Sequence, residues 1–131
     1  MEEGDGFKQA QDEWISRVTD QVKDLVPEKS HATWRTLVMK IKRTPGTGVE
    51  LSMRLRNQMG IDRVLEPNAA AQMVAKELHA LYSTFGMTNW QILEARFGQS
   101  LDTEGKKPPV VTCIVSVDPT TNTGMFGSVK Q

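Results

Sequence analysis

The chain has 131 residues, of which 38% are hydrophobic and 24% charged, a composition that suits one globular domain and argues against a disordered chain. Lys and Arg together number 16, as do Asp and Glu, so no net charge draws the chain to nucleic acid or to anionic lipid. The single cysteine excludes an internal disulfide, and no apolar run approaches the roughly 18 residues of a membrane span. The acidic N-terminus lacks the apolar segment of a secretory signal, so we expect a cytoplasmic protein with no membrane partner.

The first half of the chain predicts one helix followed by two strands. Apolar residues recur at helical spacing from Phe7 to Val26, and Pro27 limits the end of this helix. Strands are expected at Trp34–Arg43 and Val49–Asn57, and the second of them alternates apolar and polar residues without interruption. The sequence Thr-Pro-Gly-Thr-Gly between the strands is rich in turn residues, so the two strands should form a hairpin.

The second half repeats this pattern after a linker. Gln58–Glu66 carries only weak signals and is interpreted as a linker without regular structure. A helix is expected over Asn68–Phe85, with Gly86 at the position that follows its C-terminus. Two further strands are expected at Asn89–Phe97 and Val110–Val117, the latter composed largely of β-branched residues.

The order of these elements predicts the fold class and the domain boundaries. An α-β-β-α-β-β order suits an α+β domain in which two amphipathic helices cover one face of a four-stranded, mainly antiparallel sheet. Residues 98–109 contain glycines and two prolines and predict a long, mobile loop in the second hairpin. Residues 1–118 therefore form the predicted domain, and the polar residues 119–131 predict a flexible C-terminal tail.

The strand positions that would face away from the helices form a candidate interaction surface. These alternate positions hold five cationic side chains but only two carboxylates, those of Glu50 and Glu94, and tryptophans lie at the border of the surface. Arg and Trp are the residue types that most often dominate binding energy in protein interfaces. The predicted partner-binding residues are Lys40, Lys42, Arg54, Arg56, Arg96, Trp34 and Trp90. The alternative is an ordinary solvated sheet face with cross-strand ion pairs, on which the tryptophans cap the core at the strand ends.

The residues that could support catalysis or bind metal are few. His31, His79 and Cys113 supply too few nitrogen and sulfur donors for a four-ligand metal site. Cys113 lies among β-branched residues, where a thiol is expected to be buried and to have a raised pKa. Asp102 and Glu104 lack the spacing of a calcium-binding loop. We therefore expect no catalytic residues, no metal and no cofactor.

Several local sequences occur in the order that is typical of one known family. Leu25-Val26-Pro27 ends the first helix, and Trp34 opens a hairpin. Residues 78–86, Leu-His-Ala-Leu-Tyr-Ser-Thr-Phe-Gly, run from the second helix toward Asn89-Trp90, and Asp-Thr-Glu-Gly-Lys at 102–106 stands near the tip of the closing hairpin. In these features residues 7 to 118 resemble the YezG/EsaG-type immunity proteins. The resemblance implies an intracellular antitoxin that binds and neutralises a toxin enzyme, often a nuclease, without catalysis of its own.

The sequence therefore favours a non-enzymatic protein-binding module, most concretely an immunity or inhibitor protein that neutralises a partner enzyme. One alternative is a nucleic-acid-associated or viral accessory protein that uses the basic parity of the sheet. Another alternative is a small enzyme whose site forms only at a dimer interface. An edge strand could pair two chains, so the sequence leaves homodimerisation open.

Overall fold

The computed structural model describes residues 3–44, 48–100 and 108–118, with the backbone alone for residues 3–5. Helix α1 (Glu3–Asp20) comes first, followed by two short 3-10 helices, η1 (Val22–Asp24) and η2 (Glu28–Ser30). The remaining elements are β1 (Trp34–Arg43), β2 (Val49–Asn57), β3 (Asp62–Leu65), α2 (Ala69–Thr84), β4 (Ile92–Ser100) and β5 (Val110–Asp118).

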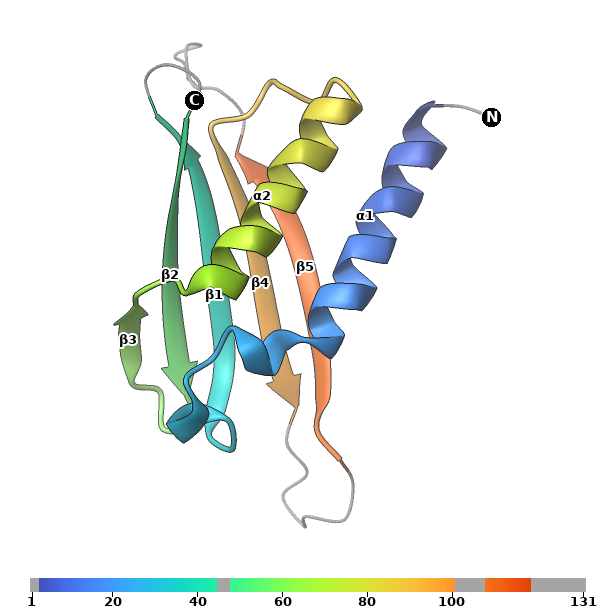
Figure 1. Ribbon diagram of the computed structural model, residues 1–131. Coiled ribbons are helices and arrows are strands. Elements are labelled where there is room, and N and C mark those ends of the chain that lie inside the picture. The colour runs from blue at the N-terminus through green and yellow to red at the C-terminus, as the bar shows by residue number, and fades with distance from the viewer. Residues whose placement is uncertain (1–2, 45–47, 101–107, 119–131) are drawn as a thin grey trace, which may run out of the picture.

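All five strands belong to one antiparallel sheet with the order β3-β2-β1-β4-β5. Both helices lie on the same side of this sheet, so the molecule has a helical layer and a sheet layer (Figure 1). The predicted α+β class with an antiparallel sheet is confirmed. The predicted number of four strands is wrong, because a fifth strand forms within the segment that was interpreted as a linker.

The additional strand β3 forms because a tight turn folds the chain back onto β2. Asn57 Oδ1 accepts hydrogen bonds from the backbone N–H groups of Met59 (2.9 Å) and Ile61 (3.0 Å). Gly60 occupies the turn with φ of +81°, a conformation that glycine adopts at little cost. The strand is only four residues long, and Leu65 alone is buried, so its sequence shows no alternation that would reveal it.

The helices confirm two of the sequence signals and shift several boundaries. Asn68 caps α2, its Oδ1 accepting the backbone N–H of Ala71 at 2.8 Å, and Gly86 follows the helix with φ of +70°. The first helix ends at Asp20, and the chain continues to Val26 partly as the 3-10 turn η1. Strand β4 begins and ends three residues later than expected, so it includes residues 98–100 of the predicted loop. The rest of that loop up to residue 107, and the predicted tail at 119–131, lie outside the described residues.

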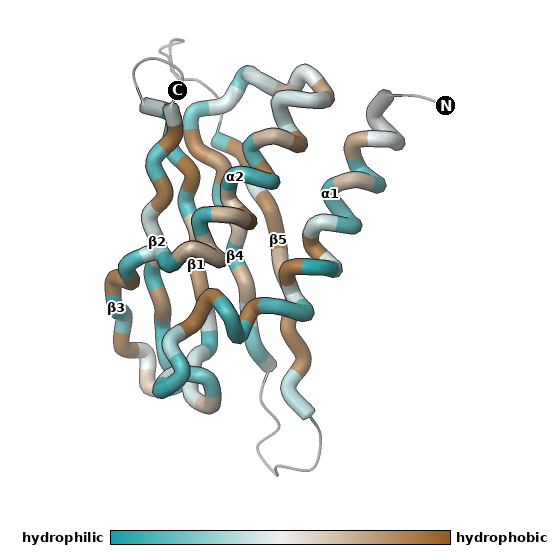
Figure 2. The backbone as a smooth tube through the Cα atoms, viewed as in Figure 1, coloured by the Kyte–Doolittle hydropathy of each residue, from teal (hydrophilic) through white to brown (hydrophobic). Residues whose placement is uncertain are grey.

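The core lies between the helices and the sheet. Buried and more exposed residues alternate along most of β1 and β2, and the buried residues of the two helices belong to the same core cluster as those of the sheet. Hydrophobic residues recur along both helices and along the strands (Figure 2). The largest side chains that are fully buried include Trp34, Trp90 and Phe97. Trp14 Nε1 donates a hydrogen bond to the Val74 carbonyl (3.2 Å) and Tyr82 Oη donates one to Gln11 Oε1 (2.6 Å), so α1 and α2 are also joined by polar contacts. Among the described residues, no helix combines the length and apolar character that membrane crossing requires.

Candidate functional site

The candidate site is the face of the sheet opposite the helices, here called the outer face. Strand alternation presents on it the side chains of every second residue. These positions are Thr36, Val38, Lys40 and Lys42 of β1, Glu50, Ser52, Arg54 and Arg56 of β2, Asp62 and Val64 of β3, Ile92, Glu94, Arg96, Gly98 and Ser100 of β4, and Val110, Thr112, Ile114, Ser116 and Asp118 of β5. All five cations of the predicted partner-binding set lie here, so the sheet brings Lys40, Lys42, Arg54, Arg56 and Arg96 onto one surface.

The outer face carries charges of both signs and is less basic than the sequence predicts. The strand registers add Asp62 and Asp118 to the expected Glu50 and Glu94, so four carboxylates accompany the five cations. Asp62 lies on the outer face because strand β3 pairs it with Arg56. Asp118 lies there because β5 extends one residue further than predicted. The surface therefore has a small positive excess.

Most of the charged side chains on this face are already paired. Arg56 donates two hydrogen bonds to Asp62, at 3.0 and 3.2 Å. These hydrogen bonds hold the pKa of Asp62 below its ordinary value, and the charge of Arg54 adds to the effect. Glu94 lies between Arg96 (3.3 Å) and Lys40 (4.0 Å) and so partners both cations. The guanidinium of Arg54, by contrast, makes no ion pair within 4.0 Å to any side chain that the structure describes.

Arg54 stands in a row of residues that crosses all five strands. The registers place apolar and cationic side chains alternately along this row, in the order Val64, Arg54, Val38, Arg96 and Ile114. The side chains at its two ends are prominently exposed, Val64 at 71% and Ile114 at 69%. Two hollows, of about 280 and 240 Å³, adjoin the middle of the row and share Val38, Arg54 and Arg96 in their walls. The row thus offers a partner both apolar contact and a cation.

The two tryptophans of the predicted set do not belong to this surface. Trp34 and Trp90 are only 0% and 1% exposed, so their predicted place beside the cations is wrong. The β1–β2 register shifts between Trp34 and Thr36, which inserts an extra residue and turns Trp34 to the helix side. Trp90 precedes β4, which begins at Ile92, so strand alternation does not apply to it. The alternative prediction, that the tryptophans cap the core, describes their places.

Trp90 belongs to a cluster that the sequence analysis missed. The Arg43 guanidinium lies 3.9 Å from the centre of the Trp90 ring, and it donates hydrogen bonds to the carbonyls of Trp90 (2.8 Å) and Thr88 (3.1 Å). His79 meets the same ring edge-on at 5.7 Å. Burial, together with the charge of Arg43, lowers the pKa of His79. Arg43 is the final residue of β1, so strand parity alone could not show that it clamps the segment before β4.

Of the remaining candidate chemical groups, Cys113 and His31 make contacts within the fold, whereas Asp102 and Glu104 lie outside the described residues. Cys113 is half-buried against the core rather than fully buried as predicted, and this burial raises the pKa of its thiol to about 12. His31 Nε2 lies 2.8 Å from the carbonyl oxygens of both Lys23 and Val26, so this nitrogen carries the proton and ties η2 to η1. Within residues 3–44, 48–100 and 108–118, no three His, Cys, Asp or Glu side chains are placed to hold a metal ion.

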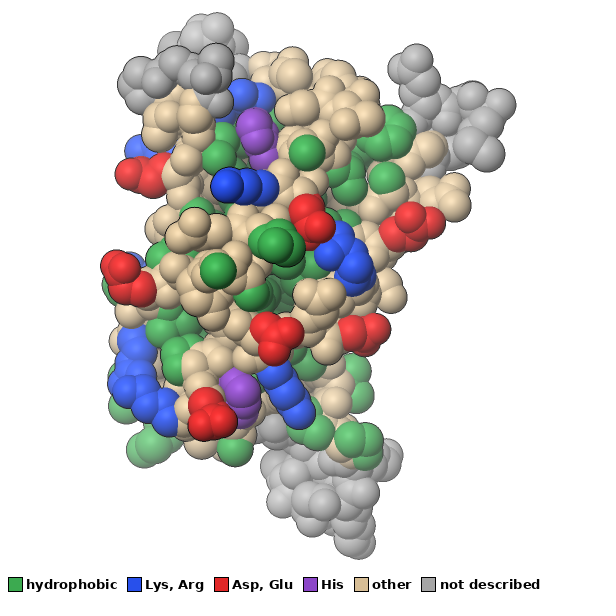
Figure 3. Space-filling view, in the orientation of Figure 1, with side chains coloured by type: hydrophobic (Ala, Val, Ile, Leu, Met, Phe, Trp, Pro, Cys, Tyr) green, Lys and Arg blue, Asp and Glu red, His purple; other side chains and the backbone are tan. Residues whose placement is uncertain are grey.

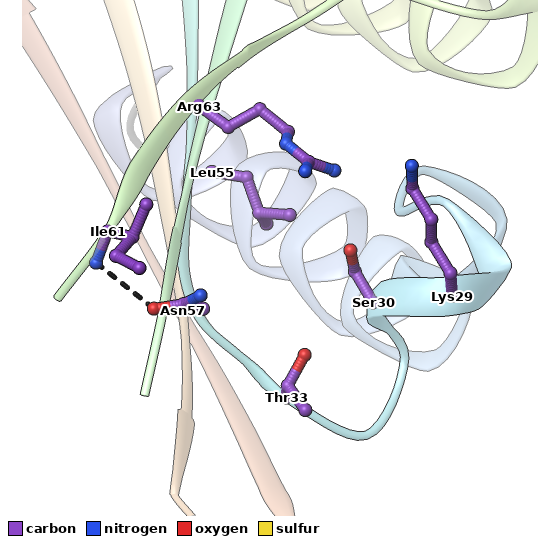
Figure 4. Close-up of a pocket in the computed structure, with 7 residues that line it drawn as sticks. All are labelled: Lys29, Ser30, Thr33, Leu55, Asn57, Ile61 and Arg63. Carbon is purple, nitrogen blue, oxygen red and sulfur yellow. Dashed lines mark hydrogen bonds between the residues drawn. The ribbon is translucent and has the colours of Figure 1, made fainter. Parts of the chain in front are cut away.

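The helix side of the molecule presents a different arrangement of charge. Acidic and basic side chains are scattered over the two helices, with apolar patches between them (Figure 3). Among the described side chains, the ion pairs that involve helix residues are Lys8 with Asp12 at 3.5 Å and Arg17 with Glu77 at 3.0 Å. Among the hollows on this side is one next to β3, and Lys29 and Arg63 are among the residues that line it (Figure 4). Neither of these two residues was singled out by the sequence, because both fall in segments without a clear pattern.

Comparisons of this chain with protein-family models, with curated proteins and with solved structures gave no match.

Proposed function

We propose that the chain is a non-enzymatic protein-binding module whose outer face docks onto another protein. The observation that carries this proposal is the row from Val64 to Ile114, in which exposed apolar side chains alternate with Arg54 and Arg96. Binding energy in protein interfaces concentrates in arginines and apolar anchors that become desolvated together. This row provides both across the width of the sheet.

Charge complementarity defines the partner surface that fits the row. Arg54 has no ion pair in the described part of the chain, whereas Arg56 and Arg96 are engaged by Asp62 and Glu94. A partner carboxylate placed over Arg54 would gain a charge-assisted hydrogen bond without displacing an existing one. Apolar side chains beside that carboxylate would cover Val38 and Val64. The partner is therefore a folded protein that presents an acidic residue among apolar ones.

The most concrete form of this function is that of an immunity or inhibitor protein. The resemblance of residues 7 to 118 to YezG/EsaG-type antitoxins supports it, as does a surface that suits a folded partner. In this role the chain acts in the cytoplasm and neutralises a toxin enzyme. Nucleic acid is disfavoured as the partner, because its phosphates would meet four carboxylates on the same face.

The test uses the protein encoded beside the gene of this chain as the candidate partner. We expect the two proteins to form a complex in which the enzyme loses its activity. The double variant Arg54→Glu/Arg56→Glu should remain folded and should lose both binding and inhibition. A folded double variant that binds and inhibits as well as the unmodified chain would contradict the outer face as the interface. A neighbour that neither binds nor is inhibited would contradict the immunity role.

A further inference from the structure

The hollow near β3 is a donor-lined pocket on the helix side of the sheet, the side opposite to the outer face (Figure 4). It has a volume of about 240 Å³ and lies between η2 and the β2–β3 hairpin. Its lining consists of Lys29 and Ser30 from η2, Thr33 from the following turn, Leu55 and Asn57 from β2, and Ile61 and Arg63 at the start of β3. Three separate stretches of the chain therefore converge on it.

The charge of this pocket has one sign. Lys29 and Arg63 are the charged members of the lining, and no carboxylate is among the residues that form it. Neither cation makes an ion pair within 4.0 Å to a side chain in the described part of the chain. Both side chains extend toward the space above Leu55 (Figure 4). A bound anion in this space would be attracted by both cations.

Uncharged donors complete the lining. The hydroxyl groups of Ser30 and Thr33 point into the same space (Figure 4). Asn57 Oδ1 accepts hydrogen bonds from the backbone N–H groups of Met59 and Ile61, so the orientation of this amide is fixed. Its Nδ2 is consequently the free end and is available as a donor. No hydrogen bond within the described residues occupies the Ser30 hydroxyl, the Thr33 hydroxyl or Asn57 Nδ2.

The walls of the pocket are held in place without a ligand. The backbone N–H of Gln58 donates to the Thr33 carbonyl at 3.0 Å, and its Nε2 donates to the Ala32 carbonyl at 3.1 Å. His31, which directly follows η2, donates from Nε2 to the carbonyls of Lys23 and Val26 and so holds η2 in place. These contacts join η2 to the end of β2. Because the backbone around the pocket is already held, the ordering cost of binding falls mainly on the exposed side chains of Lys29 and Arg63.

We propose that this pocket binds the phosphate group of a small phosphate monoester. A tetrahedral phosphate presents three oxygens in different directions, which matches donors that approach from η2, β2 and β3. Arg63 offers a planar fork and Lys29 a point charge, the two modes by which proteins hold phosphate. Leu55 and Ile61 provide apolar contacts for the organic part of the ester. A planar carboxylate would leave part of this donor set unused.

Titration by NMR tests the proposal on the full chain. Phenyl phosphate, inorganic phosphate and acetate are added separately at constant ionic strength. Phenyl phosphate should shift the amide resonances of residues 29–33 and 57–63 in a saturable way, and should bind more tightly than acetate. Its affinity should also rise between pH 5 and pH 7, because the second phosphate pKa is about 6.

Two variants distinguish a built site from general charge attraction. Arg63→Gln should weaken phenyl phosphate binding by roughly tenfold or more, since a charge-assisted hydrogen bond is lost. Arg54→Gln, which removes a cation from the outer face, should leave the affinity unchanged. Thr33→Val conserves the shape of the side chain and should weaken binding by a few fold, which provides a second reading if Arg63→Gln proves unstable.

Three results would overturn the phosphate site. The first is the absence of saturable shifts with phenyl phosphate, and the second is equal affinity for acetate, which would indicate a carboxylate site. The third is equal weakening by Arg63→Gln and Arg54→Gln, which would indicate an adventitious ion only. None of these results bears on the outer face, so this inference stands or falls separately from the proposed function.

Discussion

The two faces of the sheet have the same strands but opposite character. On the helix side, Leu37 and Met39 of β1 are 0% and 1% exposed and belong to the core cluster that also contains residues of α1, η1 and α2. On the outer face, Val38 stands between the two and is flanked instead by Arg54 and Arg96. Folding alone accounts for the first face. The second face combines apolar and cationic side chains in a way that folding does not require, and for this reason we assign binding to it.

The largest expected contrast compares neighbouring residues of β1. Leu37→Ala should lower the free energy of unfolding by about 2–5 kcal/mol, because it leaves a cavity in a closely packed core. Val38→Ala should lower it by about 1 kcal/mol or less, because its side chain borders solvent. Urea denaturation of both variants measures the difference. Similar losses for the two variants would mean that the outer face also contributes strongly to stability.

A smaller effect is expected at the polar cluster around Trp90, on the helix side. Arg43→Gln removes the contact with the indole ring and the hydrogen bonds to the carbonyls of Trp90 and Thr88. We expect a loss of about 1–3 kcal/mol in unfolding free energy. Arg43→Lys keeps the charge over the ring and should recover part of the loss. If both variants are as stable as the parent chain, Arg43 does not clamp the segment before β4.

The pH dependence of stability should also trace to this cluster. Burial and the charge of Arg43 lower the pKa of His79 in the folded chain. As the pH falls, His79 therefore takes up a proton more readily in the unfolded chain than in the folded chain. The contribution of His79 to stability is therefore complete above its ordinary pKa of 6.5 and is lost progressively as the pH falls below that value. His79→Gln should flatten the stability profile between pH 7 and pH 5. An unchanged slope would contradict the assignment.

The smallest effect is expected for the ion pair on the outer face. Arg56 and Asp62 are both exposed to solvent, where screening leaves a hydrogen-bonded ion pair little net value. Arg56→Ala should change the urea midpoint only marginally, and adding salt to the unmodified chain should have a comparably small effect. A clearly lower midpoint would show that this pair holds β3 to β2, which would make it a structural element of the outer face.

The strand alternation and the helical stripes were predictable from the sequence because each extends over many residues. The strand predicted at Val49–Asn57 has the same bounds in the structure. Asn68 and Gly86 flank α2 at the ends where the sequence places them. Strand β3 could not be predicted, because its four residues form only once the turn at Gly60 places them beside β2. Its absence from the prediction also removed Asp62 from the expected surface, which made that surface seem more basic than it is.

The tryptophans show a second limit of sequence periodicity. Parity places Trp34 with the outer residues of β1, but one extra residue before Thr36 reverses its direction. A bulge of this kind depends on pairing between strands, which a single sequence does not display. The pocket around Lys29 and Arg63 was missed for a related reason, since its donors come from three segments that only the folded chain brings together.

The most direct test of the outer face compares two charge reversals on opposite sides of the molecule. Arg54→Glu alters the middle of the outer row, and Lys76→Glu makes the same change in charge on the exposed surface of α2. Calorimetric titration with the partner protein measures the dissociation constant of each variant. We predict that Arg54→Glu weakens binding by roughly 30-fold or more, the loss typical of an arginine at a hot spot of an interface, and that Lys76→Glu changes it less than about twofold. Equal effects, or a larger effect of Lys76→Glu, would contradict the assignment of binding to the outer face.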